Sequence, residues 1–305
     1  MARRSAAHGV LVVDKPRGPT SHDVVRWARR ALRTRAVGHA GTLDPMASGV
    51  LVVAAGEATK LVRWLTADDK AYRATIALGA ETDTLDAEGV IVERAPAEGI
   101  DLAAARAVAA RFIGPQRQRP PAYSAIRVDG ERAHERARRG EEVELAERDV
   151  VVHRLEVREA RPDAIEIELE CSKGFYVRSL ARDLARALGT RGHLSALRRT
   201  RSGAFSIDVA VGGDVLERAA KGDDATREAL LGRLLDLGAA CGGMPRVVLD
   251  ERGVRDARHG RPVRGTFGVP AGVEPVALFD EGGALVAIAR SEGESLAVVR
   301  GFPLA

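Results

Sequence analysis

The sequence predicts an α+β fold that ends in a small β-rich module. Residues 165–170 alternate apolar with acidic side chains, which is the period of a half-buried strand. Residues 24–32 place apolar side chains at helical spacing. After residue 243, short apolar segments are separated by Gly and Pro, as in small β modules. A chain of 305 residues has room for about two domains, and we expect them at residues 1–243 and 244–305.

The first third of the chain contains a clear helix start. Val10–Val13 is an apolar strand, and Thr20 with Asp23 forms the pattern of a capping box at the head of a helix. Residues 50–54 read as a second strand, and residues 59–65 as one or two helical turns.

The rest of the chain alternates between the two element types. Tyr72–Leu78 has strand alternation, residues 101–112 form an Ala-rich helix, and a helix is expected from about Val177 to Leu188. A Leu-rich helix is expected over 226–237. The strands expected in the C-terminal module are residues 246–249, 276–279, 284–289 and 296–299.

Composition bounds the class of protein. Hydrophobic residues make up 45% and charged residues 30%, which excludes wholesale disorder. The two cysteines, Cys171 and Cys241, exclude a disulfide framework and a Cys-rich zinc site. Apolar runs are too short to span a membrane, and the N-terminal pattern is not that of a signal peptide. We expect no membrane association and a location in the reducing cytoplasm.

Charge is unevenly distributed along the chain. The formal net charge is +4, yet residues 1–43 and 190–204 are strongly basic and residues 80–102 strongly acidic. Arg26, Arg29, Arg30 and Arg33 fall on one helix face. A basic face of this kind suits a polyanionic partner, although for any single charge run we favour the simpler interpretation of a solvated surface.

Several common catalytic motifs are missing from the sequence. It has no phosphate-binding or dinucleotide-binding Gly-rich motif, no His-Glu-x-x-His and no Gly-x-Ser-x-Gly. We therefore expect no metal and no cofactor. The acids at positions 81, 83, 86 and 88 do not match a calcium loop, and we interpret them as a solvated turn.

The segment 38–49 is the most informative part of the chain. Its glycines and its Asp-Pro pair, placed between a polar helix and an apolar strand, predict a shaped loop. Asp44 precedes Pro45 and is therefore held in extended backbone. The chain has only three Tyr and five Lys, and most of these cluster in a few segments, which suggests that they have specific roles.

Several segments of the chain together match the motifs of one known protein family. The chain resembles the TruB-type tRNA pseudouridine-55 synthases over roughly residues 9–210. The motifs that carry the resemblance, in order along the chain, are Val13-Asp14-Lys15-Pro16-x-Gly18-x-Thr20-Ser21-His22, Gly38-His39-x-Gly41-Thr42-Leu43-Asp44-Pro45-x-Ala47-Ser48-Gly49, Lys70-x-Tyr72 with Gly79-x-x-Thr82-Asp83-Thr84-x-Asp86-x-Glu88-Gly89, Pro120-Pro121-x-Tyr123-Ser124-Ala125, and Cys171-Ser172-Lys173-Gly174-x-Tyr176-Val177-Arg178 followed by Leu197-Arg198-Arg199-Thr200-x-Ser202-Gly203.

The resemblance implies a fold and a site. It implies a catalytic domain with a mixed or antiparallel central sheet flanked by helices, followed by a PUA-like RNA-binding module over 244–305. Asp44 matches the catalytic aspartate, Arg178 its ionic partner, and Tyr72 the residue stacked on the target uracil and suspected in the final proton step. The other substrate contacts that it implies are the pocket aromatic Tyr176, the apolar wall Leu197 and the loop-entering His39. Plausible phosphate contacts are Arg26, Arg30, Arg198 and Arg199.

The implied chemistry agrees with the missing motifs. Pseudouridine formation breaks the N1–C1′ bond of a uridine, turns the base over and joins C1′ to C5, without redox change or metal. It needs a carboxylate near C1′ or C6 and a base for the C5 proton. Burial would raise the pKa of Asp44 and a neighbouring guanidinium would oppose this. The expected partner is tRNA, through its T arm and T loop, with no obligatory protein partner and a monomeric enzyme.

Other interpretations remain open at this point. A glycosidase would need a second carboxylate about 5–9 Å from Asp44, and no motif supplies one. A tRNA-folding chaperone would use the same RNA contacts, with binding rather than catalysis as its main role. A related synthase guided by accessory proteins would act on another RNA. Because the motifs begin at Val13, we expect the stand-alone bacterial type.

Overall fold

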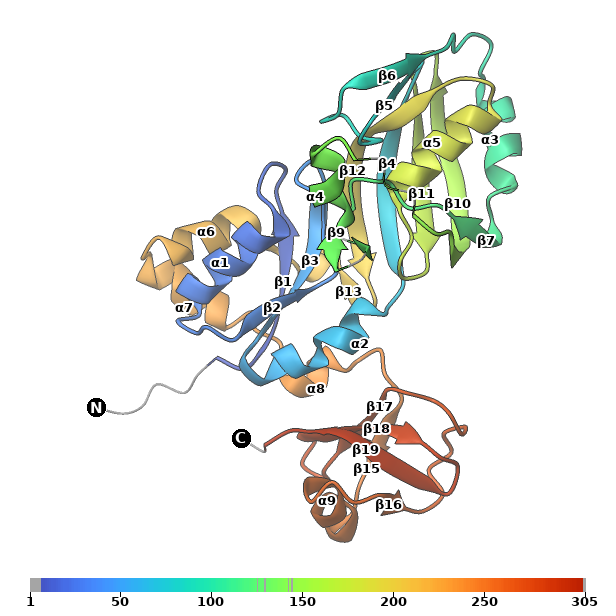
Figure 1. The fold of residues 1–305 in the computed structure, drawn as a ribbon. Coiled ribbons are helices and arrows are strands. Elements are labelled where there is room, and N and C mark those ends of the chain that lie inside the picture. The colour runs from blue at the N-terminus through green and yellow to red at the C-terminus, as the bar shows by residue number, and fades with distance from the viewer. Residues whose placement is uncertain (1–6, 125, 129, 142, 144, 304–305) are drawn as a thin grey trace. The chain divides into compact units, whose positions relative to one another are not determined.

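The computed structural model describes residues 7–124, 126–128, 130–141, 143 and 145–303 (Figure 1). These form two compact units. The first contains the described residues up to Leu43, residues 51–67 and those from Gly203 onward, and the second contains residues 44–50 and 68–202. The first unit is therefore assembled from three separate stretches of chain. No helix in the described residues is long and apolar enough to cross a membrane.

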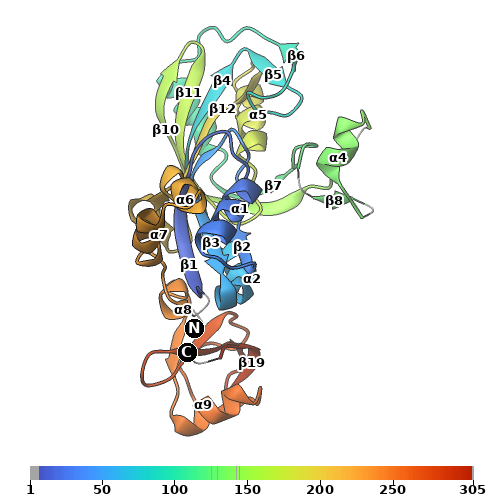
Figure 2. The same cartoon turned by 90° about the vertical axis from the view of Figure 1, so that its left-hand side faces the viewer.

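The first unit begins with the strand and helix that the sequence predicts. Thr20 caps the first helix through its hydroxyl and Asp23 completes the capping box, as expected. Strand β1 (Gly9–Lys15) pairs in parallel with strand β14 (Val211–Gly212), through Val13 with Val211. The elements up to residue 243 are β1 (Gly9–Lys15), α1 (Ser21–Ala31), β2 (Val37–Ala40), β3 (Ser48–Ala55), the 3-10 helix η1 (Gly56–Leu61), α2 (Val62–Thr66), β13 (Phe205–Ser206), the 3-10 helix η2 (Ile207–Val209), β14 (Val211–Gly212), α6 (Gly213–Ala220), α7 (Asp224–Leu231) and α8 (Leu237–Ala240). Figure 2 shows α1, α6 and α7 packed together.

The predicted helix over 226–237 is wrong in its second half. Helix α7 ends at Leu231 with Gly232 as its cap, and residues 232–236 leave the helix. Leu235 instead exchanges two backbone hydrogen bonds of 2.8 Å with Val10. Asp236 then caps the short helix α8. Pairing with a strand that lies more than two hundred residues earlier in the chain outweighs the helical propensity of this segment.

The second unit is built on an antiparallel sheet with strand order β12-β4-β11-β10-β7. Helices α5 and α3 lie on one face of this sheet (Figure 1), and β8, β9 and α4 project away from it (Figure 2). The elements are β4 (Lys70–Leu78), β5 (Ala80–Thr82), β6 (Ile91–Arg94), α3 (Leu102–Ala110), β7 (Gly114–Gln118), β8 (Arg127–Val128), β9 (Glu131–Arg132), α4 (Ala133–Arg138), β10 (Arg148–Arg161), β11 (Ala164–Cys171), α5 (Val177–Ala187) and β12 (Gly192–Ser202).

Parallel pairing makes the overall sheet mixed. Ser48 and Gly49, at the start of β3, pair in parallel with Arg198 and Arg199 of β12. The expected α+β class with a mixed central sheet is thus confirmed. Strand β12 was not predicted, because its polar and basic sequence reads as a charged surface run rather than as a strand.

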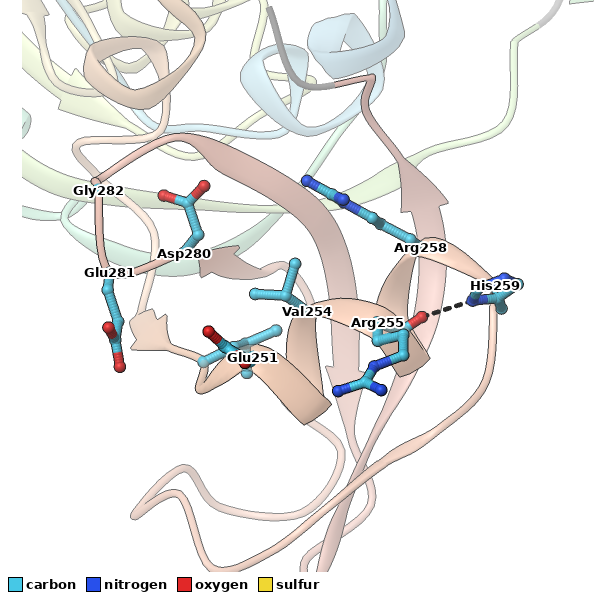
Figure 3. Close-up of a pocket in the computed structure, with 9 residues that line it drawn as sticks. Glu251, Val254, Arg255, Arg258, His259, Asp280, Glu281 and Gly282 are labelled. Carbon is cyan, nitrogen blue, oxygen red and sulfur yellow. Dashed lines mark hydrogen bonds between the residues drawn. The ribbon is translucent and has the colours of Figure 1, made fainter.

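Residues 246–301 form a separate five-stranded sheet of order β15-β17-β18-β19-β16. Four of its strands lie close to the four expected segments, whereas the strand at Val263–Arg264 was not predicted. The sheet has its own apolar core, which includes Val276, Leu278 and Leu296. The elements are β15 (Arg246–Val248), α9 (Glu251–Arg258), β16 (Val263–Arg264), β17 (Val276–Phe279), β18 (Leu285–Ser291) and β19 (Ser295–Gly301). Beside α9 lies a shallow hollow of about 460 Å³, lined by side chains of both charges such as Arg258 and Asp280 (Figure 3).

Candidate active site

The loop before β3 holds Asp44 in a defined position. The Ala47 amide donates to the Asp44 carbonyl at 3.1 Å, which closes a turn with Pro45 in its second position, where proline is favoured. Just upstream, the Ser21 hydroxyl accepts from the Leu43 amide at 2.9 Å and donates to the Leu43 carbonyl at 3.0 Å. The backbone on both sides of Asp44 is therefore fixed, which confirms the predicted shaped loop.

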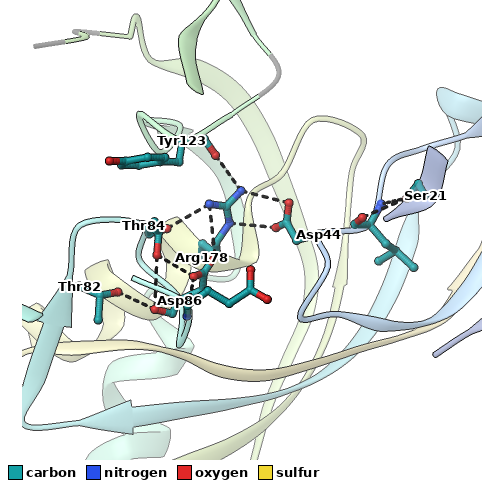
Figure 4. A network of polar contacts seen from close by, with 9 residues as sticks. Ser21, Asp44, Thr82, Thr84, Asp86, Tyr123 and Arg178 are labelled. Carbon is teal, nitrogen blue, oxygen red and sulfur yellow. Dashed lines mark hydrogen bonds and ion pairs between the residues drawn. The ribbon is translucent and has the colours of Figure 1, made fainter. Parts of the chain in front are cut away.

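Arg178 contacts the Asp44 carboxylate through two of its guanidinium nitrogens (Figure 4). Its Nε lies 3.0 Å from Oδ2 and its Nη2 lies 3.3 Å from Oδ1. The Arg178 side chain is 7% exposed, whereas that of Asp44 is 34% exposed. A buried two-point contact fixes the plane of the carboxylate. One side of the carboxylate thus remains open to a reactant.

The remaining donors of Arg178 are also occupied. Nη1 donates to the Thr84 carbonyl and Nη2 to the Tyr123 carbonyl, each at 3.0 Å, and Nη1 lies 3.5 Å from Oδ2 of Asp86. Arg178 sits in the first turn of α5, where the helix dipole disfavours a cation. The two carboxylates offset this cost, so the cation is held in place by its anionic neighbours.

Asp86 corrects the interpretation of the acidic segment. It is 4% exposed, and it accepts from the Thr84 hydroxyl at 2.6 Å and the Glu88 amide at 3.1 Å. Glu81 is also buried, paired with Arg186. A solvated turn therefore describes Asp83 and Glu88, which are exposed, but not Glu81 or Asp86. The two buried acids differ from the two exposed ones in having an arginine partner more than ninety residues away in the chain. The local sequence gives no signal of that partner.

Gln118, which the sequence analysis missed, positions the start of α5. Its side-chain oxygen accepts from the Tyr176 amide at 2.8 Å and its amide nitrogen donates to the Tyr176 carbonyl at 3.1 Å. One turn further along α5, Ser179 donates to the Arg119 carbonyl at 2.8 Å. Gln118 is 3% exposed, so these bonds are shielded from water. They fasten the helix that carries Arg178 to the end of β7.

Two of the predicted aromatic residues lie near the carboxylate. Tyr72 and Tyr176 are half-buried, and burial raises the pKa of both phenols, with the Asp44 charge contributing in the same direction. Both are therefore neutral phenols near pH 7. The Arg148 guanidinium lies 5.7 Å from the Tyr176 ring centre. Leu197 is 8% exposed and pairs with Ala74, one position along the same strand face from Tyr72.

The arginines of β12 point to opposite faces of the sheet. Arg199 faces the same side as Tyr72, its cross-strand partner, and is 1% exposed. Arg198 lies on the other side, opposite Arg73, and its Nη1 contacts the Ser48 hydroxyl at 3.4 Å. Burial argues against the expected phosphate contact by Arg199. Since side chains alternate along a strand, adjacent arginines cannot serve one surface together.

The remaining predicted residues lie in the first unit. Arg26 and Arg30 are exposed on α1, and Arg26 is paired with Asp23. His39 is half-buried on β2, where it pairs with Val53. Of the motif residues quoted above, Ala125 lies outside the described part of the chain. Within that part, no group of three or more His, Cys, Asp or Glu side chains is placed to hold a metal ion.

Gly49 gives a test of how tightly the site is built. Its φ is +103°, and a Cβ there would lie 2.2 Å from the Arg199 carbonyl oxygen. We expect Gly49→Ala to destabilise the fold by roughly 2 kcal/mol or more, through both strain and the clash. Chemical denaturation measures this. A control is Gly140→Ala, whose positive φ is similarly strained but which has no atom within 4 Å. Equal losses in the two variants would contradict the importance of the close approach.

The fold is that of a pseudouridine synthase. Solved structures with the same fold include a Cbf5-Nop10-Gar1 complex, with TM-score 0.76 and 27% identity over 98% of this chain and 86% of that one. An H/ACA RNP bound to a substrate RNA containing 2′-deoxyuridine gives 0.75 and 26% over 98% and 86%.

The chain belongs to the TruB family of tRNA pseudouridine synthases, which are isomerases. The model of the TruB family pseudouridylate synthase N-terminal domain matches residues 29–177, and that of the tRNA pseudouridylate synthase B C-terminal domain matches 178–240. The tRNA pseudouridine synthase B of Thermobifida fusca is 45% identical over 95% of this chain and 96% of its own length. That of Corynebacterium aurimucosum is 54% identical over 68% and 72%.

Proposed function

We propose that this enzyme converts uridine 55 in the T loop of tRNA to pseudouridine, with Asp44 as its catalytic carboxylate. The observation that carries the proposal is the two-point contact of the buried Arg178 with the partly exposed Asp44. It holds a carboxylate in a fixed orientation beside two neutral tyrosines. These are the requirements of a reaction that needs an anionic group at C1′ or C2′ and an aromatic surface for the base.

The target nucleotide must leave the helical stack to reach this carboxylate. Flipping costs a few kcal/mol, which stacking of the uracil on Tyr72 and contact with Leu197 offset. His39 takes the place that the base leaves in the loop. Tyr176, held by its backbone to Gln118, closes the other side of the pocket.

The reaction is a rearrangement with no net change in composition. The N1–C1′ bond breaks and its electron pair stays on the uracil. Asp44 either forms a bond to C1′ or takes the C2′ proton, and in both cases it is released unchanged at the end. C5 then bonds to C1′, loses its proton to a base, and N1 gains one. Arg178 stabilises the Asp44 carboxylate whenever it carries its charge.

The exposed arginines of α1 are proposed to bind tRNA phosphates, together with Arg198. For about four contacts with a duplex stem, the tRNA association constant should fall on the order of 100-fold between 50 and 200 mM salt. A filter-binding titration over salt measures this. The double variant Arg26→Gln, Arg30→Gln should flatten the slope, whereas Arg158→Gln, on β10, should not. A flat response in the wild type would remove the argument for a basic RNA-binding face.

Residues 244–305 are proposed to act as a PUA-like RNA-binding domain. This region has its own apolar core, and it also contacts α2 of the same unit through Glu274, which pairs with Arg63 and accepts from Nε1 of Trp64 at 3.1 Å. We expect deletion of 244–305 to weaken tRNA binding about 10-fold or more, while the single-turnover rate at saturating enzyme changes less than about 3-fold. Binding and single-turnover assays on the same preparation measure both. Equal loss in rate and affinity would instead indicate that the region supports the fold.

We further propose that the enzyme works in the cytoplasm as a monomer without an obligatory protein partner. The test is single-turnover pseudouridine mapping on an unmodified tRNA transcript, with the purified chain and no cofactor. Product at the T-loop uridine alone supports the proposal. Product at another position would contradict the assigned target. No product with tight tRNA binding would favour a chaperone role or another RNA substrate.

A further inference from the structure

Arg199 occupies a position that the proposed reaction has not used. It is among the largest fully buried side chains of the protein, with 1% exposure. Its Nε donates to the Val50 carbonyl at 2.7 Å, and its backbone lies against Gly49. Burying a guanidinium is costly unless its donors are satisfied, so its location requires a reason.

The cross-strand register places Arg199 beside Tyr72. The two residues are direct partners in the antiparallel pairing of β12 with β4, so their side chains stand next to each other on one sheet face. Burial raises the pKa of the Tyr72 phenol, and the neighbouring Arg199 acts against it through its charge and a side-chain hydrogen bond. Leu169 is the partner of Tyr72 on the opposite strand.

A hydroxyl held in this way has a fixed direction. Tyr72 has one oxygen and two rotatable bonds, and a donor on a rigid strand removes most of this freedom. The Val50 carbonyl fixes the guanidinium in turn, so the order of contacts runs from Val50 through Arg199 to Tyr72. Lys70, the next residue on the same face, has its pKa lowered to about 8, chiefly by burial and then by the Arg199 charge.

We propose that Arg199 is a positioning residue that orients the Tyr72 hydroxyl over the flipped uracil, rather than a contact to the tRNA backbone. This rests on the proposed function, because it gives Tyr72 its role at the base. Arg199 touches no reacting atom. Its effect on rate must therefore pass through the Tyr72 hydroxyl and disappear when that hydroxyl is removed.

The test is a double-mutant cycle with Arg199→Lys and Tyr72→Phe. Lysine keeps the charge but loses the planar fork, and phenylalanine keeps the ring but loses the acceptor. We expect Arg199→Lys to lower the single-turnover rate about 10-fold, with tRNA affinity changed less than about 2-fold, and to have no further effect in the Tyr72→Phe background. Arg201→Lys, on the other face of β12, is the matched control.

Each outcome of the cycle is informative. Equal fold losses in the two backgrounds, or a loss of affinity that accounts for the lost rate, would overturn the inference. An inactive wild-type enzyme would instead overturn the proposed function. Failure of the inference about Arg199 can thus be distinguished from failure of the proposed function. If Arg199→Lys fails to fold, nitrogen-15 NMR of the arginine side chains compares wild type with Tyr72→Phe. A protected Nη–H signal lost in Tyr72→Phe supports the inference, and unchanged spectra overturn it.

Discussion

Replacing Asp44 by Asn is expected to abolish turnover while leaving tRNA binding nearly intact. Asparagine has almost the same shape but carries no charge, and its amide presents N–H groups to the Arg178 guanidinium. Removing a nucleophile or an essential carboxylate costs on the order of 10⁴-fold or more in rate. Single-turnover pseudouridine formation measures the rate, and filter binding measures an affinity that should change less than about 3-fold.

The matched control for this variant is Asp149→Asn, an exposed position on β10 in the same unit. It makes the same charge change away from the site and should leave the rate unchanged. Continued product formation by Asp44→Asn, after exclusion of wild-type contamination, would show that another carboxylate performs the chemistry. Asp86 would then be the first candidate, because it is the second carboxylate at Arg178.

Replacing Arg178 by Lys is expected to be the next most damaging change. An ammonium group cannot reproduce the two parallel contacts to Asp44 while also reaching Thr84 and Tyr123. We expect the single-turnover rate to fall on the order of 10²-fold, by analogy with the loss of one fixed electrostatic contact in other enzymes. Affinity for tRNA should change little, since Arg178 is buried. Rate and binding assays on the same preparation separate the two.

Stability must be followed in the same variant. Lysine leaves Asp86, which is 4% exposed, with a poorer partner, and a poorly paired buried charge destabilises a fold. We therefore expect a lower denaturation midpoint as well as a lower rate. Arg182→Lys, one turn further along α5 and paired with Asp183, is the control for an arginine-to-lysine change in this helix. A wild-type rate in Arg178→Lys would mean that the two-point contact is not needed for catalysis.

The sequence predicted the loop that carries Asp44 better than it predicted the sheet around it. The loop could be identified because Gly, Asp and Pro constrain the backbone locally, whereas the pairing of Asp44 with Arg178 was expected only from the family resemblance. The capping box at Thr20 is equally local. Strand β12 was missed because its apolar face is interrupted by Arg199, a buried residue whose Nε donates to the Val50 carbonyl of the distant strand β3.

The errors share one physical cause. Asp86 and Glu81 look like surface acids until α5 brings Arg178 and Arg186 against them. Residues 232–236 look helical until Leu235 pairs with Val10. Gln118 carries no signal at all in the sequence. In each case the deciding partner lies far away in the chain, where neither periodicity nor local composition can register it.

The discontinuous make-up of the first unit has a consequence for biosynthesis. Val13 cannot pair with its strand partner Val211 until Val211 has been synthesised, nearly two hundred residues later. At 5–20 residues per second this delay is on the order of 10 to 40 s. Residues 68–202 can complete their antiparallel sheet within that time. Strand β3, the other neighbour of β1 in the sheet, is synthesised much earlier, so the edge of β1 that β14 will cover is the one that stays unpaired on the nascent chain. Ribosome-associated chaperones should therefore have their longest engagement with this N-terminal segment.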